Sequence, residues 1–233
     1  MKGQNQLHPY LEYPRTRAGD DYWGQIKRTV GGQPVGEDQI QMIVDSVLSG
    51  LQIEPDDVLL DFCCGNGALT DRIFARCRGG LGVDFSPPLI EVAKRDFERP
   101  GERNYRLQDA TEFAETTVEV EGFTKALCYG SFPYLSARDA ERLLTLVCER
   151  FPSIERLMVG NLPDRAKAVA FLGPHYRPGV EDDPDAPLGI WRTEDQFISM
   201  ARQAGWACVL SRPQPPFYGA GYRYDAVLTR LEK

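Results

Sequence analysis

Short apolar segments alternate with amphipathic segments along this 233-residue chain, and this alternation limits the possible folds more than any other feature. Strand-length apolar segments occur at 58–62, 81–84, 105–108, 125–129 and 156–160. Helical spacing of apolar residues occurs at 37–51, 68–76, 87–97, 137–151 and 194–203. Strands that are joined by helices run parallel, because each crossover returns the chain to the same end of the sheet. The sequence therefore predicts an α/β fold with helices on both faces of a mostly parallel sheet.

The end of the chain departs from this pattern. Two further apolar segments, 207–211 and 222–231, are separated by residues rich in Pro and Gly, which leave no room for a crossover helix. We expect these two segments to pair as antiparallel strands. The predicted sheet therefore has seven strands, with an antiparallel pair at its C-terminal end.

Two segments lie outside the repeating pattern. Residues 1–36 are irregular and rich in Gly and aromatic side chains, so we interpret them as an N-terminal arm or lid. Residues 163–191 are a Pro- and Gly-rich insertion after the fifth strand. The predicted organisation is an arm at 1–36 and one domain at 37–233, with the insertion on its substrate side.

Composition restricts the partners and the compartment. The chain has 27 basic and 34 acidic residues and a net charge of −7, which argues against a nucleic-acid partner. Its apolar runs are too short for a membrane span, and its first residues lack the apolar stretch of a signal peptide. We therefore expect a cytoplasmic protein without a nucleic-acid or membrane partner; the oligomeric state is not indicated. The six cysteines match no zinc pattern, so we interpret them as reduced, buried, small hydrophobic residues.

Acidic side chains and glycines follow the first three predicted strands. Asp61, Gly65 and Gly67 lie at the end of the first strand, Asp84 at the end of the second and Asp109 just after the third. The carboxyl ends of parallel strands meet at one edge of the sheet, where ligands bind in folds of this kind. We therefore expect these residues to converge on one crevice.

The three carboxylates fit the parts of one ligand. Asp84, 17 residues after Gly67, is placed to accept hydrogen bonds from both hydroxyls of a ribose. Asp109 suits the exocyclic amine of an adenine, and Asp61 suits a cationic group. For Asp61 or Asp109 alone, helix capping is an equally good explanation. Taken together, the acids describe an adenosine with a positively charged tail.

The chain resembles a class I S-adenosylmethionine-dependent methyltransferase over about residues 37–231. Residues 60–67 resemble the family's first motif, 82–86 its ribose-binding motif and 108–110 its adenine-binding motif. The resemblance implies a Rossmann-like three-layer sandwich and S-adenosyl-L-methionine as cofactor, with S-adenosyl-L-homocysteine as product. The cofactor-binding residues that it implies are Asp61, Cys63, Gly65, Gly67, Asp84, Phe85, Ser86, Asp109, Ala110 and Tyr129. Cys63 stands where the family usually has its first glycine.

Two other functions compete with this interpretation. A nicotinamide dinucleotide enzyme would need a third glycine near residue 70, where this chain has Thr70. A protein of the same fold that binds the cofactor without catalysis, as a regulator, is compatible with the same motifs. We therefore predict a methyltransferase, with these two functions as alternatives.

The methyl acceptor is expected to be the oxygen or nitrogen of a small molecule such as a metabolite, sugar or natural product. In-line transfer to an oxygen benefits from a general base, and some metal-independent members of the family carry a histidine in a region comparable to that of His175. Tyr134 is a weaker catalytic candidate. No acidic ligands follow the fourth strand, so no catalytic metal is predicted. The residues expected to bind the acceptor are Tyr22, Trp23, Arg28, Tyr176 and Trp191.

Overall fold

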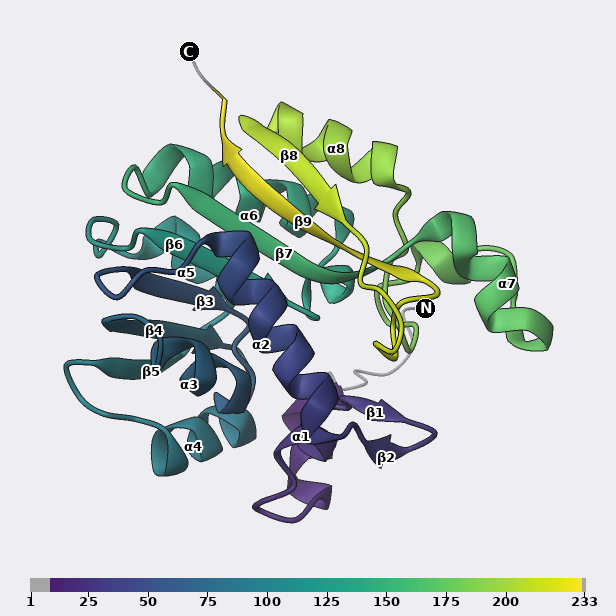
Figure 1. Cartoon of the computed structure of the whole chain (residues 1–233), viewed down its shortest axis with the longest axis horizontal. Helices are drawn as coiled ribbons and strands as arrows, with labels where there is room; N and C mark the ends of the chain where they lie inside the picture. The colour runs from purple at the N-terminus through teal and green to yellow at the C-terminus, as the bar shows by residue number, and fades with distance from the viewer. Residues whose placement is uncertain (1–8, 232–233) are drawn as a thin grey trace, which may run out of the picture.

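A seven-stranded sheet forms the centre of the computed structural model, which describes residues 9–231 (Figure 1). Its strands lie in the order β5-β4-β3-β6-β7-β9-β8. Their bounds are β3 Val58–Phe62, β4 Gly79–Asp84, β5 Arg103–Leu107, β6 Lys125–Tyr129, β7 Arg156–Pro163, β8 Trp206–Ser211 and β9 Arg223–Arg230. The first five are parallel, and β9 runs antiparallel between β7 and β8. The predicted fold class is confirmed.

The register of the parallel strands brings their carboxyl ends together. Phe62 pairs with Val83, and Asp84 pairs with Leu107 on the next strand. Strand order reverses at β3, because β4 lies on one side of it and β6 on the other. In open α/β sheets this switch point leaves a crevice beyond the strand ends, so the fold places a binding site there.

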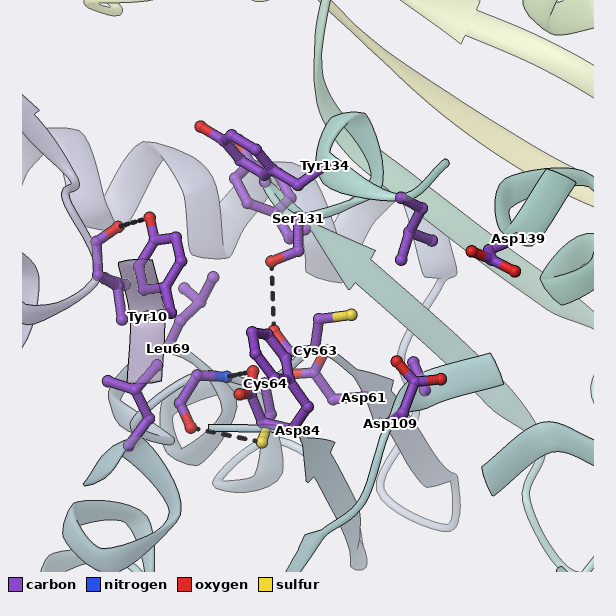
Figure 2. A pocket seen from close by; sticks show the side chains of 18 of the residues that line it. Tyr10, Asp61, Cys63, Cys64, Leu69, Asp84, Asp109, Ser131, Tyr134 and Asp139 are labelled. Carbon is purple, nitrogen blue, oxygen red and sulfur yellow. Dashed lines mark hydrogen bonds between the residues drawn. The ribbon is translucent and has the colours of Figure 1, made fainter. Parts of the chain in front are cut away.

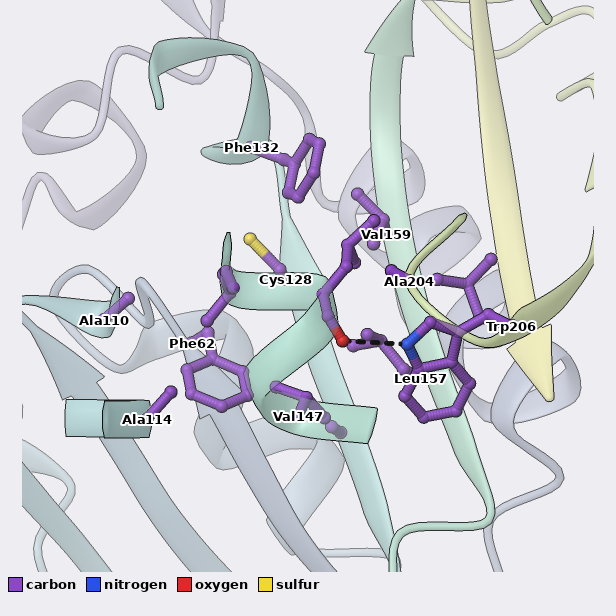
Figure 3. Close-up of a cluster of buried hydrophobic side chains, with 14 of the residues drawn as sticks. Phe62, Ala110, Ala114, Cys128, Phe132, Val147, Leu157, Val159, Ala204 and Trp206 are labelled. Carbon is purple, nitrogen blue, oxygen red and sulfur yellow. Dashed lines mark hydrogen bonds between the residues drawn. The ribbon is translucent and has the colours of Figure 1, made fainter. Parts of the chain in front are cut away.

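Helices cover both faces of the sheet. On one face, α2 (Glu37–Leu51), α3 (Ala68–Phe74) and α4 (Pro87–Asp96) bury their apolar sides in a shared cluster. On the other, α5 (Ala110–Thr116), α6 (Ala137–Arg150) and α8 (Glu194–Gln203) bury a second cluster. Figure 3 shows part of that second cluster, where the Trp206 Nε1–H donates to the carbonyl of Leu144 at 2.9 Å. These two layers of helices and the sheet make the three-layer sandwich.

Local capping chemistry explains several helix starts. Thr193 and Gln196 form a complete capping box at the start of α8. At α6, Ser136 accepts from the backbone N–H of Asp139, which is one half of such a box. Ser86 precedes α4, but its side chain makes no cap, because its hydroxyl donates to the carbonyl of Tyr10 in the N-terminal arm.

The structure contains further short elements outside the main alternation of strands and helices. Helix α5 is short and begins directly at Asp109, which caps it. The arm contains η1 (Pro9–Leu11), η2 (Tyr13–Thr16), α1 (Tyr22–Gln25) and a small hairpin of β1 (Thr29–Val30) and β2 (Gln33–Pro34). The segment after β7 contains η4 (Arg165–Lys167), α7 (Ala168–Leu172), η5 (Gly173–His175) and η6 (Val180–Asp182). Residues 1–8 of the predicted arm lie outside the described residues.

Two sequence expectations about single features can be compared with the described residues. All six cysteines are free, and Cys64 and Cys128 are buried while the other four are partly exposed. Within residues 9–231, every helix is too short or too polar to span a bilayer.

Candidate functional site

A cavity of about 330 Å³ opens at the carboxyl ends of the central strands (Figure 2). It lies where the strand order reverses, with residues of the N-terminal arm on its rim. Eight of the predicted cofactor-binding residues line it: Asp61, Cys63, Gly65, Asp84, Phe85, Asp109, Ala110 and Tyr129. The crevice that the sequence predicted is therefore present, and it gathers all three carboxylates.

The turn after β3 forms the floor of the cavity and depends on glycine. Gly65 and Gly67 adopt φ values of +60° and +78°, in the left-handed region that L-residues avoid. A Cβ on Gly67 would lie 2.9 Å from the Tyr105 ring, so space excludes a side chain as well. Cys63 is also left-handed, with φ at +61°. This strained backbone explains why glycine is usual at that position and shows that cysteine is accommodated there.

Asp84 is held in place by the turn it faces. Its Oδ2 accepts from the Gly65 N–H and its Oδ1 from the Ser86 N–H, each at 2.9 Å. The side chain is buried, and this burial raises the pKa of the Asp84 carboxyl to about 6 even though these N–H groups favour the charged form. Asp84 is thus a fixed, pre-oriented acceptor at the cavity wall.

Asp61 is the most deeply desolvated of the three acids. Burial raises the pKa of its carboxyl to about 7, while a 2.6 Å hydrogen bond from the Thr70 hydroxyl to Oδ2 favours ionisation. The negative charge of Asp84 also raises the pKa of Asp61. A cation in the cavity would offset the free-energy cost of burying the ionised carboxyl, so Asp61 suits a positively charged ligand group.

Asp109 combines the two roles that the sequence left open. Its Oδ1 accepts from the backbone N–H groups of Thr111 and Glu112, at 2.9 and 3.0 Å, and so caps α5. No hydrogen bond to its Oδ2 is recorded within residues 9–231, and the residue lines the cavity. One oxygen therefore builds the helix while the other is available to a ligand.

The opposite wall is aromatic and basic. Tyr10, Arg28, Tyr129 and Tyr134 line it, and the Arg28 guanidinium lies 5.3 Å from the centre of the Tyr129 ring. The Arg28 Nε and Nη1 atoms are buried and have no hydrogen-bond partner among the described residues. Burial raises the pKa of the Tyr134 hydroxyl, which donates to the carbonyl of Pro187 at 2.9 Å. This wall is complementary to a negatively charged or hydrogen-bonding group.

Two predicted cofactor residues stand just behind the lining. Gly67 begins α3, and Ser86 ties the arm to the sheet through its bond to the Tyr10 carbonyl. They shape the residues that face the cavity but are not part of its surface.

Of the predicted acceptor-binding residues, Arg28 reaches the cavity and four do not. The Tyr22 hydroxyl donates to Asp96, and Trp23 packs beneath Arg72. The Tyr176 hydroxyl donates to Glu181. Trp191 is buried against Tyr222 and Phe171.

The two predicted catalytic residues are placed differently. Tyr134 lines the cavity, directly after β6. His175 is exposed in η5, beyond α7, and is not part of the cavity lining. The role of His175 as general base stays a prediction, and the position of His175 outside the cavity lining does not support it.

Several lining residues were not predicted from the sequence. They fall into the arm, the turn and first helix after β3, the start of α4 and the loop between β6 and α6: Tyr10, Ile26, Cys64, Leu69, Leu89, Gly130, Ser131, Leu135, Ser136 and Asp139. The last group could have been found from its position, because every residue directly after a parallel strand faces the same edge. The arm residues carried no such signal.

A metal site is not evident in the part of the chain that the structure describes. No group of three or more His, Cys, Asp or Glu side chains is arranged there to hold an ion.

Comparison with known proteins identifies the domain. A family model described as "Methyltransferase domain" matches residues 59–150, which contain the three carboxylates and the glycine turn. The ribosomal protein L11 methyltransferase of Thermus thermophilus is 32% identical over 148 residues, covering 60% of this chain and 51% of that protein. An uncharacterized methyltransferase of Schizosaccharomyces pombe is 28% identical over 107 residues, covering 43% of this chain and 37% of that protein. The chain thus spans about half or less of these curated relatives.

Solved structures show the same fold at low sequence identity. Magnesium protoporphyrin IX methyltransferase from Synechocystis PCC 6803, crystallised with S-adenosylhomocysteine, matches with a TM-score of 0.64 and 17% identity, covering 94% of this chain and 97% of that one. A cyclopropane synthase from Mycobacterium tuberculosis matches with a TM-score of 0.69 and 14% identity, covering 97% and 100%. These likenesses establish the Rossmann-like methyltransferase fold.

The expectation that nucleic acid is excluded as a partner is wrong. A 23S rRNA uracil methyltransferase of Mannheimia succiniciproducens is 29% identical over 90 residues, and a small RNA methyltransferase shares the fold with a TM-score of 0.60. Net charge is a property of the whole chain, whereas nucleic-acid binding depends on a local surface. The balance of −7 therefore does not decide the kind of partner.

Proposed function

This chain carries the methyltransferase domain of the class I, S-adenosylmethionine-dependent family, and on that premise we propose that it methylates an oxygen or nitrogen atom of a small molecule. The observation that carries the proposal is the single cavity that unites the glycine turn with Asp61, Asp84 and Asp109. In a nicotinamide enzyme Asp61 would have no evident ligand group to bind, because a nicotinamide dinucleotide has no amino-acid ammonium group.

The residues of the cavity fit S-adenosylmethionine. Asp84 is oriented by two N–H groups and would accept the ribose hydroxyls. The free Oδ2 of Asp109 would accept the adenine amine, and Asp61 would face the cationic amino-acid part. The left-handed glycines let the backbone approach the ligand closely. When bound, the cofactor supplies a methyl group that its positive sulfur has already activated.

The chain's own contribution to the reaction is positioning. Because the methyl group needs little further activation, the protein has to exclude water and to align the acceptor with it. Tyr10 from the arm and Tyr134 from the loop after β6 stand on the rim of the cavity, where they would cover both ligands. Their rings lie 6.5 Å apart, centre to centre, and contact edge to face.

A small-molecule acceptor suits this geometry. The described cavity is bounded by strand ends and by the arm, with a volume at the lower end of the range for small-molecule sites. Tyr134 is the residue we assign to the acceptor's reacting group, as a hydrogen-bond partner that orients it. Burial raises the pKa of this phenol, so Tyr134 would act with its proton in place rather than as a base.

Calorimetry tests the cofactor assignment. The protein should bind S-adenosylhomocysteine and S-adenosylmethionine, and the Asp84→Ala variant should bind both at least a hundredfold more weakly, because hydrogen bonds to a charged acceptor contribute about 1.5–3 kcal/mol each. The Asp56→Ala variant, which changes a side chain that is 99% exposed, serves as control. Binding of NAD in place of these ligands would refute the assignment.

A methyl-transfer assay then separates an enzyme from a non-catalytic binding protein. Radiolabelled S-adenosylmethionine is incubated with a metabolite panel, with and without a chelator. Transfer that survives the chelator is the expected result, and cofactor binding without transfer to any acceptor would favour the regulatory alternative.

A further inference from the structure

We propose that the acceptor carries a negatively charged carboxylate or phosphate group, which is held beside Gly130 by Arg28, Asn161 and Arg223. This inference rests on the proposed function, because it names the class of substrate that the same site takes. It starts from four residues: Gly130 just after β6, Asn161 in β7, Arg223 at the beginning of β9 and Arg28 from the arm.

Gly130 leaves a space that two nitrogen donors face. A Cβ on Gly130 would stand 3.5 Å from the Arg28 Nη2 and 3.5 Å from the Asn161 Nδ2. The φ of Gly130 is +84°, so the position favours the absence of a side chain, and Gly130 and Arg28 both line the cavity. A ligand oxygen that approaches Gly130 from this side would face an amide nitrogen and a guanidinium nitrogen.

Asn161 is fixed in an unusual conformation at this point. Its φ is +64°, within the register shift that interrupts the pairing of β7 with β9. Asp225 accepts from its backbone N–H at 2.6 Å, and Arg223 donates to its carbonyl. The side chain is 9% exposed, and its Oδ1 has no partner among the described residues. Strain and unsatisfied polar atoms of this kind concentrate at functional sites.

Arg223 adds a second buried positive charge. It is 7% exposed, and its Nε has no hydrogen-bond partner within residues 9–231. Its guanidinium lies 4.8 Å from the centre of the Tyr222 ring. Its positive charge acts to lower the pKa values of the Tyr129 and Tyr134 hydroxyls in the cavity wall, against the effect of their burial. No ion pair to Arg28 or Arg223 is recorded in the described part of the chain. Asp225 is near Arg223, but its two oxygens are used by the Asn161 N–H and the Ser46 hydroxyl.

The acids and the arginines come mostly from different elements, although Asp139 after β6 also lines the cavity and the charge of Arg28 acts to lower the pKa of Asp61. Asp61, Asp84 and Asp109 belong to β3, β4 and the residue after β5, where the adenosine and its cationic tail would bind. Arg28 comes from the arm and faces Gly130, whereas Arg223 begins β9 and donates to the Asn161 carbonyl in β7. S-adenosylmethionine carries a single carboxylate and a net positive charge, so it neutralises at most one arginine. Asp225 supplies a negative charge near Arg223 but no hydrogen bond to its buried Nε, which an anionic acceptor would supply better than a neutral one.

Calorimetry on the complex with S-adenosylhomocysteine tests this directly, with benzoate and phenyl phosphate as probes and benzamide as their neutral counterpart. At least one anion should bind at least tenfold more tightly than benzamide. In Arg223→Gln that anion should bind about tenfold more weakly. Asn161→Asp should weaken it similarly by placing a negative charge beside the space at Gly130; aspartate tolerates the same backbone conformation. Both variants should keep their affinity for S-adenosylhomocysteine within about twofold, and Arg202→Gln, on the exposed side of α8, should match the wild type throughout.

The outcomes are distinguishable from failure of the proposed function. If the wild type does not bind S-adenosylhomocysteine, the cofactor assignment itself fails. If it does, equal binding of benzamide and the anions overturns the inference. Unchanged anion affinity in both the Arg223 and Asn161 variants also overturns it. The inference fails as well if the variants lose affinity for S-adenosylhomocysteine enough to account for their whole loss of anion affinity, since the arginines would then serve the cofactor's carboxylate.

Discussion

The affinity for S-adenosylhomocysteine should fall as the pH is lowered from 8 to 6. Burial raises the pKa of Asp61 to about 7 and that of Asp84 to about 6. In the proposed complex the ligand's amino group and ribose hydroxyls bind the ionised carboxylates, so binding would lower both pKa values. Affinity is therefore complete above the pKa of the free protein and is lost as the pH falls through it.

The size of the effect follows from these two pKa values. At pH 8 both carboxylates are almost fully ionised, whereas at pH 6 about one in eleven Asp61 side chains and about half of the Asp84 side chains are ionised. If both must be charged, the dissociation constant rises about twentyfold. The charge of Asp84 raises the pKa of Asp61, so the two groups titrate as a pair rather than independently.

Isothermal titration calorimetry at half-unit steps between pH 6 and pH 8, in two buffers of different ionisation enthalpy, measures both the affinity and the protons released. The Asp61→Asn variant should retain only about a twofold dependence, which comes from Asp84. The Asp56→Asn variant, with an exposed carboxylate, should follow the wild type. An affinity that is constant from pH 6 to 8, without proton release, would refute the idea that desolvated carboxylates hold the ligand.

Three further predictions concern stability and turnover. Because the pKa of Asp61 is raised to about 7, the ligand-free folded state binds a proton at this carboxyl more tightly than the unfolded state does. This group therefore stabilises the fold at low pH, and the stabilisation is lost as the pH rises through 7. The Asp61→Asn variant should accordingly raise the melting temperature more at pH 8 than at pH 5. Tyr134→Phe should reduce turnover about tenfold or more, because Tyr134 lines the cavity. His175→Ala should change turnover less than about threefold, because His175 is exposed and lies outside the cavity lining, and a loss of about a hundredfold in this variant would reverse the assignment. Trp206→Phe should lower the free energy of unfolding by about 1–3 kcal/mol, since it leaves the buried Leu144 carbonyl without the indole donor, and chemical denaturation with an unchanged slope would measure it.

The periodicity of apolar residues was sufficient to predict the sheet. The strand β6 and the helix α8 were both predicted with the bounds that the structure has. Such elements are predictable because burial and local hydrogen bonding both act within a few residues. Helix α5 was missed because it is short, although Asp109, which caps it, had been recognised as a possible helix cap.

The convergence of the three carboxylates on one cavity was also predictable from the sequence. Asp61, Asp84 and Asp109 each lie at the end of a strand or directly after one, and the topology of a parallel sheet brings such positions to one edge. The resemblance of the surrounding motifs to one family added the identity of the ligand. The composition did less, because the charge balance described the whole chain and led to a wrong conclusion about nucleic acid.

The sequence by itself determined the order of strands and helices, the glycine turn and the three acids, because these depend on local spacing and on the rule that parallel strands end together. Only the tertiary structure decided which distant residues complete the cavity. Tyr10 and Arg28 reach the cavity from the arm. Asn161 lies behind Gly130 and is bonded to Arg223, 62 residues further along the chain. It also placed His175 at the surface. Contacts of this kind arise from how the arm and β9 pack against the sheet, and no periodic pattern in the chain encodes that packing.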